Sequence, residues 1–447
     1  MQNKLILLFS LCFIGMGFSQ EKTKGFSLKD AISFAIKNNY NVKTAQNNVR
    51  AAKEKQWETT TIGLPKINAK VDYQKWLKQA TTLLPAEING GAPGTFVPVQ
   101  FGTQQNVNAS ITLTQLIFDG SYIVGLQSAK TYLNISNQAQ EKTELVIREA
   151  VINAYGNVLI AEKSIEILEG NLKIVEKNLS DVKSIYKNGL TEEENVEQLQ
   201  ITFTTVKSQL NKTIRLRDLG YKMLNISMGN SIDESIVLTD NLDSLILENL
   251  DLNLLAETFV VSNHIDFKIA ENTKEGNRLL VLLEKSMALP TLKAFVNYGY
   301  AGNAESFDFF RNDQKWYNSS LLGVSLEVPI FSSFNRRSRT RQAQFELDNA
   351  DIKLIEIKKQ LNLKADAAKS DYKFSIEQYQ AAKQNLELAQ RIEKKQQVKF
   401  FEGVSTSFDL AQAQNQLYTQ QQNYVQSMLD VIAKKAALEN ALNIPLK

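Results

Sequence analysis

The chain has 447 residues, 22% of them charged and 43% hydrophobic, and its formal net charge is +3. A charge this close to neutral does not indicate a nucleic-acid-binding protein, and we expect no nucleic-acid partner. The only cysteine, Cys12, lies in a segment that we expect to be removed, so the mature chain has neither disulfides nor thiol chemistry.

Residues 1–19 are expected to form a secretory signal peptide. Lys4 supplies the positive start, Leu5 to Gly17 the apolar stretch, and Gly17-Phe18-Ser19 a small-x-small cleavage site. A transmembrane anchor is the alternative, but the apolar stretch is shorter than the ~20 residues that a helical span needs. No later stretch is long and apolar enough for such a helix, so we expect strands to carry any membrane insertion.

Residues 20–64 are expected to form the N-terminal helix of a first repeat. Ser27 and Asp30 have the spacing of a capping box, which predicts a helix from this point to about Thr61. Leu64-Pro65 then ends the helix, because proline cannot continue it.

Residues 65–117 are predicted to form a β-hairpin. Apolar and polar side chains alternate from Ile67 to Leu77 and from Asn106 to Leu113, which is the pattern of strands with one apolar face and one polar face in contact with water. The stretch 78–104 between them is rich in Pro and Gly, and we expect it to be a long loop. The polar face is expected to line the lumen of a barrel; its predicted lumen residues are Lys66, Asn68, Lys70, Asp72, Asn106 and Asn108.

Residues 121–229 are predicted to form a long helical hairpin. The first helix has no proline and is expected to end at Gly189, and Thr191 starts a second helix that ends near Met228. Gly at a helix C-terminus followed by Thr or Ser is typical of such hairpins. Residues 230–250 have a mixed pattern and are assigned only as a connector.

The same order of elements then repeats, which indicates an internal duplication. Residues 31–73 align with 256–298 without a gap and at an odd offset, so the apolar face should move from odd to even positions, as it does in the second half. The repeat predicts a helix at 251–289, a β-hairpin at 290–330 and a helical hairpin at 334–443. From Asn335 to Glu402 there is no Gly or Pro, and Leu347, Leu354, Leu361 and Ala368 recur every seven residues. Such a coiled-coil helix would be roughly 100 Å long.

The strands have the length and pattern of a membrane barrel wall. Each is about ten residues long, near the 9–11 that cross a bilayer at a tilt. Tyr73, Trp76, Trp316 and Tyr317 lie near strand ends, where interfacial aromatic residues occur. A soluble sandwich is the alternative, but it offers no place for helices of this length. Since four strands cannot close a barrel and open edges are not tolerated in lipid, the barrel must be shared between chains, and three chains would supply twelve strands.

Three segments then resemble a known family. They are residues 113–120, their counterpart 326–331, and the tip segment 403–418, in which Gly403, Thr406, Asp409 and Leu417-Tyr418 match the family pattern. The layout is similar to that of the TolC-type outer membrane efflux proteins over nearly the whole mature chain.

The resemblance implies the fold and the partners. The fold would be an α+β membrane protein with a long α-helical coiled-coil barrel and a β-barrel shared between three chains. The homotrimer would sit in the outer membrane lipid of a Gram-negative bacterium, extend into the periplasm, and work with a periplasmic adaptor protein and an inner-membrane pump.

The resemblance also implies functional positions at the two hairpin tips. Adaptor docking is expected at Gly189, Leu190, Thr191, Gly403, Val404, Ser405 and Thr406. The periplasmic entrance or gate is expected at Asp409, Ser405, Gln412, Glu192, Glu193 and Glu194. Ser405 stands where some members have a gate Arg, and Gln412 stands where a second acid occurs. The three glutamates can alternatively serve as favourable charges at a helix N-terminus, and Asp409 is the preferred entrance residue because it occupies the family's acidic position.

No pattern indicates an enzyme, a cofactor or a metal site. His264 is the only histidine and is expected to be a solvated residue on a helix surface, whereas catalytic triads and histidine metal sites need more partners. The cluster of Arg336, Arg337, Arg339 and Arg341 has two interpretations, a solvated helix start or contact with inner-leaflet phosphates.

Three functions compete on these grounds. They are the passive exit duct of a tripartite efflux or type I secretion system, a pump-independent porin, and a periplasmic coiled-coil scaffold that never enters the membrane. A porin needs no long helical hairpins and a scaffold needs no amphipathic strands. Both features together favour the duct, whose cargo would largely be chosen by the pump.

Overall fold

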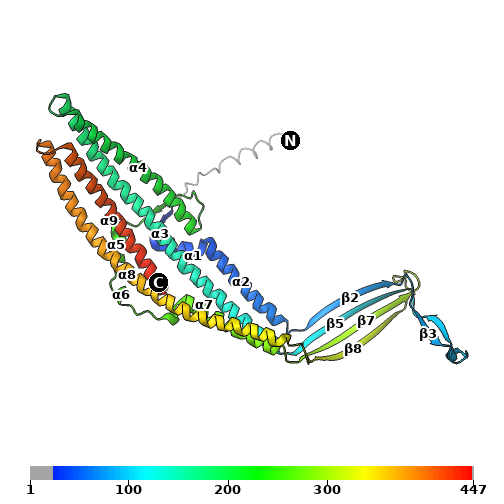
Figure 1. The fold of residues 1–447 in the computed structure, drawn as a ribbon. Helices are drawn as coiled ribbons and strands as arrows, with labels where there is room; N and C mark the ends of the chain where they lie inside the picture. The colour runs from blue at the N-terminus through cyan, green and yellow to red at the C-terminus, as the bar shows by residue number, and fades with distance from the viewer. Residues whose placement is uncertain (1–23, 445–447) are drawn as a thin grey trace, which may run out of the picture. The chain divides into compact units, whose positions relative to one another are not determined.

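A computed structural model describes residues 24–444, so the predicted signal peptide lies outside the described residues (Figure 1). The chain forms two compact units. We call residues 47–138 and 268–356 the strand unit, and residues 24–46, 139–267 and 357–444 the helical unit.

The strand unit contains a four-stranded antiparallel sheet in the order β2-β5-β7-β8. The strands are β2 Lys66–Lys75, β5 Gln105–Asp119, β7 Thr291–Ala304 and β8 Trp316–Glu327. One row across the sheet pairs Ile67 with Leu113, Leu113 with Val296, and Val296 with Leu322. The apolar residues therefore share one face in both halves of the chain, and the expected change from odd to even positions is confirmed.

The stretch 78–104, expected to be a long loop, contains regular structure. It contains a second hairpin, formed by β3 Thr81–Pro85 and β4 Phe96–Gln100, with a short 3-10 turn at Ala86–Asn89. Pro85 and Pro98 lie inside these strands. Proline is compatible with strands at a sheet edge, where its missing N–H is not needed, and both strands of a two-stranded sheet are edges.

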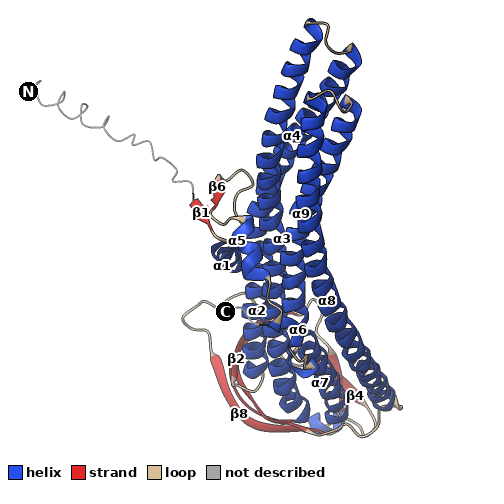
Figure 2. Cartoon of the chain, turned by 90° about the vertical axis from the view of Figure 1, so that its left-hand side faces the viewer, coloured by secondary structure: helices blue, strands red, loops and turns tan. Residues whose placement is uncertain are grey.

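Four helices have residues in both units (Figure 2). They are α2 Tyr40–Thr61, α3 Gly120–Lys187, α7 Ile265–Ser286 and α8 Asn335–Phe401. The remaining longer helices, α4 Glu193–Met228 and α9 Ser407–Ala441, complete the two helical hairpins of the helical unit. No helix among residues 24–444 is long and apolar enough to span a membrane.

The core of the helical unit lies where the N-terminal segment and the connector pack on the hairpins. Strand β1 Lys24–Phe26 pairs in parallel with β6 Ile236–Leu238, and α5 Leu242–Asn249 follows. Tyr155 is fully buried. Its hydroxyl group shares one proton between two acceptors, Phe26 O at 2.9 Å and Asp240 Oδ2 at 3.0 Å. The 230–250 stretch is therefore ordered by contacts with residues far away in the sequence.

The predicted N-terminal helix is divided in two. Ser27 and Asp30 form the expected capping box of α1 Leu28–Asn38, which is confirmed, but the helix ends at Asn39 before α2 begins. The Asn39 side chain accepts from Asn41 N at 2.8 Å and donates to Ser227 O at 2.8 Å. Asparagine competes well for nearby backbone groups, so it favours such a break over a continuous helix.

The second-repeat helix also differs from the prediction of one helix over 251–289. Short helix α6 Asn253–Ala256 and a 3-10 turn at Val261–Asn263 precede α7. His264 is buried, not solvated; the Phe259 ring packs edge to face against it at 6.1 Å, and its Nδ1 accepts from Asp266 N at 3.1 Å where α7 begins. Burial lowers the pKa of His264, which favours the neutral ring.

Candidate functional site

The two helical hairpins turn with the same backbone geometry. At the first tip, Gly189 has φ +72°, and Leu190 N donates to Ile185 O at 3.1 Å. At the second, Gly403 has φ +74°, and Val404 N donates to Lys399 O at 2.9 Å. Both turns are helix C-terminal motifs that need a left-handed residue, which explains the glycine at each.

The two tips belong to one packed end of the helical unit. Leu179 and Val182 of α3, Leu199 of α4 and Leu410 of α9 form a buried cluster, and Phe400 of α8 packs against it. The two glycines and the five positions predicted beside them for docking are therefore carried by helices whose ends are held together. Figure 1 shows both turns at one end of these helices.

Asp409 is held by its own helix terminus. Thr406 Oγ1 accepts from Asp409 N at 3.2 Å, while Asp409 Oδ2 accepts from Thr406 Oγ1 at 2.7 Å and from Thr406 N at 3.2 Å, which is a complete capping box. Ser405 Oγ donates to the same oxygen at 3.2 Å. The hydrogen bonds from Thr406 are the main cause of the lowered pKa of Asp409. Ser405 thus contacts Asp409 directly.

The three glutamates of the first tip, unlike Asp409, do not take part in a capping box. Glu192 occupies the N-cap position of α4 without a side-chain cap, and Glu193 and Glu194 follow in the first turn. All three are exposed, and within residues 24–444 their carboxylates have no hydrogen bond or ion pair. The carboxylate engaged in capping is therefore Asp409, and the three glutamates have carboxylates that face solvent. Gln412 is also exposed, one turn into α9.

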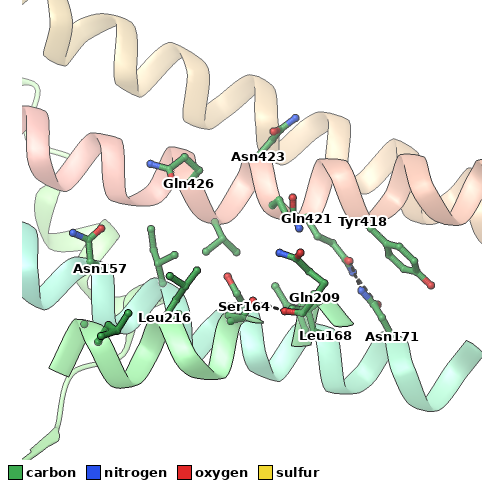
Figure 3. A pocket seen from close by; sticks show the side chains of 18 of the residues that line it. Asn157, Ser164, Leu168, Asn171, Gln209, Leu216, Tyr418, Gln421, Asn423 and Gln426 are labelled. Carbon is green, nitrogen blue, oxygen red and sulfur yellow. Dashed lines mark hydrogen bonds between the residues drawn. The ribbon is translucent and has the colours of Figure 1, made fainter. Parts of the chain in front are cut away.

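A band of amide side chains lies further along the hairpins, and the sequence analysis missed it. Asn171 Nδ2 donates to Gln421 Oε1 at 2.7 Å, and Gln397 Nε2 donates to Asn178 Oδ1 at 3.3 Å. Next to the first pair lies a cavity of about 630 Å³ between α3, α4 and α9 (Figure 3). Its lining mixes amides with apolar side chains such as Leu168. The run of Gln and Asn after Asp409 was the signal available in the sequence.

The predicted lumen residues share one face of the sheet in the strand unit. Asp72 pairs with Asn108, and Asn106 pairs with Gln74. The other three, Lys66, Asn68 and Lys70, alternate with apolar residues on β2 and lie on the same face. Lys70 Nζ lies 3.0 Å from Asp72 Oδ2. This face could line an aqueous path, because polar and charged side chains alternate along it as they do on the lumen side of a barrel wall.

The described residues contain no group of three or more His, Cys, Asp or Glu that could hold a metal ion. The tips and the polar strand face supply positions for contact and conduction.

Comparison with known proteins gives a consistent match. The family model described as "Outer membrane efflux protein" matches residues 31–219 and 266–443. The outer membrane protein TolC of Vibrio cholerae is 23% identical over 349 residues, which cover 75% of this chain and 76% of the relative.

Solved structures share the fold. The outer membrane protein VceC of Vibrio cholerae has a TM-score of 0.72 at 16% identity, covering 93% of this chain and 95% of that one. The MtrE outer membrane channel of Neisseria gonorrhoeae has a TM-score of 0.71 at 15% identity, covering 93% and 88%.

The capping role of Asp409 predicts a pH-dependent effect. We expect Asp409→Asn to speed hydrogen exchange in peptides covering residues 404–412 by about threefold at pH 7. Since the pKa of Asp409 is lowered in the folded chain, the stabilisation is complete above the ordinary carboxyl pKa of about 3.9 and is lost as pH falls through the lowered value. The difference in exchange rate between Asp409→Asn and the wild type should therefore shrink as the pH falls through the lowered pKa of Asp409.

Asp430→Asn is the matched control, because Asp430 is an exposed acid further along α9 that accepts only from Gln426. It should leave residues 404–412 unchanged at every pH. Equal exchange in wild type and Asp409→Asn at pH 7 would show that the capping box does not hold the tip.

Proposed function

The chain belongs to the outer membrane efflux protein family, and from this membership we propose that three copies form a channel-tunnel serving as the passive exit duct of a tripartite efflux or type I secretion system. It is an outer membrane protein of a Gram-negative bacterium that extends into the periplasm. The duct would carry solute without chemistry of its own, and the energy would come from the pump.

The observation that carries the proposal is a four-stranded sheet with one apolar face, one polar face and two open edges. Val71 and Val324 on the apolar face are 71% and 68% exposed in the single chain, whereas Asp72 lies on the other face. Strands β2 and β8 pair on one side only. Unpaired edges are not tolerated in lipid, so further copies must continue the sheet, and three copies give twelve strands.

The helical hairpins support the periplasmic part of the duct. Helices α3 and α8 are 68 and 67 residues long, and continue from the strand unit into the helical unit. In the proposed trimer they line a coiled-coil barrel, and the tips around Gly189 and Gly403 dock the periplasmic adaptor, which links the duct to the inner-membrane pump. A pump-independent porin does not require such hairpins, and a periplasmic scaffold does not require the amphipathic sheet.

The proposed entrance is acidic. Glu192, Glu193 and Glu194 of three copies would bring nine exposed carboxylates to one opening, and Asp409 would add three, each with its Oδ2 hydrogen-bonded by Thr406 and Ser405. Carboxylates gathered at a constriction attract cations. We therefore propose a cation-selective entrance in which the glutamates dominate, and in which Ser405 and Gln412 replace a locked Arg–acid gate.

The register of the sheet predicts how insertion responds to charge. Val71→Arg should lower outer membrane assembly, because an arginine on the lipid-facing side of a barrel costs about 2–4 kcal/mol near the midplane. Asp72→Arg, one position away on the polar face, is the matched control and should assemble nearly as wild type. Membrane fractionation with a heat-shift gel measures both. Equal defects in the two variants would mean that the assigned faces are wrong.

The left-handed turn at Gly403 predicts a separable export defect. A β-branched residue at φ +74° is strained by roughly 1–3 kcal/mol, so Gly403→Val should reshape the tip while leaving the trimer in the membrane. Gly170→Val is the control, because Gly170 lies inside α3 with open space around it and no positive φ. We expect export of a pump substrate to be abolished only in Gly403→Val. Normal export from that variant would count against adaptor docking at the tips.

A further inference from the structure

The connection from β8 to α8 has an unusual charge distribution. From Val328 to Phe345 there is no acidic residue, yet this stretch carries Arg336, Arg337, Arg339 and Arg341. The structure divides these four arginines into two pairs with different surroundings.

Two of the arginines form hydrogen bonds or an ion pair with other residues of the chain. Arg336 donates to Pro329 O at 2.9 Å, to Ile330 O at 3.4 Å and to Ser332 Oγ at 3.2 Å, and so holds the connection in shape. Arg339 Nη2 lies 2.8 Å from Glu284 Oε1 of α7. Their charges are therefore engaged within the strand unit.

The other two arginines are not engaged. Arg337 and Arg341 are exposed and lie four residues apart on one face of α8. Neither has a hydrogen bond or an ion pair to any residue between 24 and 444. Phe345 continues this face one turn further and is 65% exposed. Two adjacent guanidinium groups without a carboxylate are suited to a bidentate anion such as a phosphate.

Apolar side chains project from the connection beside these arginines. Ile330, Phe331 and Phe334 are 89%, 75% and 67% exposed, and the two phenylalanine rings meet edge to face at 6.1 Å. Leu322, Val324 and Leu326 of β8 precede them on the apolar face of the sheet. Exposed apolar residues therefore follow one another along the chain from β8 into the connection, and the arginine pair comes directly after them.

We propose that this surface binds an anionic phospholipid of the inner leaflet, with its phosphate on Arg337 and Arg341 and its acyl chains against Ile330, Phe331 and Phe334. A lipid is favoured over free phosphate because exposed apolar side chains precede the arginines by only a few residues in the chain, so one amphipathic ligand could satisfy both. The inference rests on the proposed outer membrane location, since only that location brings lipid to this surface.

The duplicated half of the chain supplies an internal comparison. At the corresponding junction of β5 and α3, Asp119 Oδ1 accepts from Ser121 N at 2.8 Å, and the next basic residue along α3 is Lys130. A strand-to-helix junction of this fold thus forms without arginines. The exposed pair at 337 and 341 is therefore not needed to make the turn and is available to a ligand.

The test compares short-chain lipids on the purified full-length trimer. Native mass spectrometry of the delipidated protein would measure binding of dioctanoyl-phosphatidylglycerol and dioctanoyl-phosphatidylcholine. We expect the wild type to prefer phosphatidylglycerol, and Arg337→Gln/Arg341→Gln to lose roughly tenfold or more of that affinity. Arg391→Gln/Lys395→Gln removes an equally spaced exposed basic pair of α8 and should have no effect.

Further measurements distinguish a lipid ligand from free phosphate. They also distinguish failure of the lipid proposal from failure of the proposed function. Inorganic phosphate in millimolar excess should not displace the lipid, and Phe331→Ser/Phe334→Ser should weaken lipid binding. Equal binding of the two lipids, no effect of the arginine change, or displacement by phosphate would overturn the lipid site. Because the trimer is checked first on a heat-shift gel, absence of any trimer in the outer membrane fraction would instead reject the proposed function. If the Gln variant does not assemble, Arg337→Ala and Arg341→Ala singly give the same comparison.

Discussion

The open edges of the four-stranded sheet are the constraint on which the rest of the account depends. Strands β2 and β8 each have a row of backbone N–H and C=O groups without partners in the sheet of one chain. Lipid offers no hydrogen bonds to such groups, so a sheet with an apolar face can enter a bilayer only if other copies complete it. The need for several chains follows from this requirement, and so does the shared lumen of the proposed trimer.

The internal duplication means that the chain uses the same order of strands and helices twice. Each half supplies one β-hairpin of the sheet and one helical hairpin, and both tips use the same left-handed glycine. The halves nevertheless differ where contact with other molecules is expected. The first tip carries three exposed glutamates, the second carries a capping box at Thr406 and Asp409, and only the second strand-to-helix junction carries arginines.

Periodic elements could be predicted from the sequence, and elements that depend on distant contacts could not. The strands and long helices follow from alternation, heptads and glycine stops, all of which are local signals. The break at Asn39, the pairing of β1 with β6 and the burial of His264 depend on residues far along the chain. At the site, position in a motif identified Asp409; its spacing from Thr406 is that of the capping box at Ser27 and Asp30, whereas the contact with Ser405 became clear only from the geometry.

The measurement that tests the central claim most directly is the mass of the complex extracted from outer membranes in mild detergent, by native mass spectrometry. Completion of the barrel by identical copies predicts one dominant species of three mature chains, and no stable monomer while the strands remain folded. A folded, membrane-extracted monomer, or a dominant assembly with another number of chains, would contradict the account, because the edges of β2 and β8 would then be satisfied in some other way.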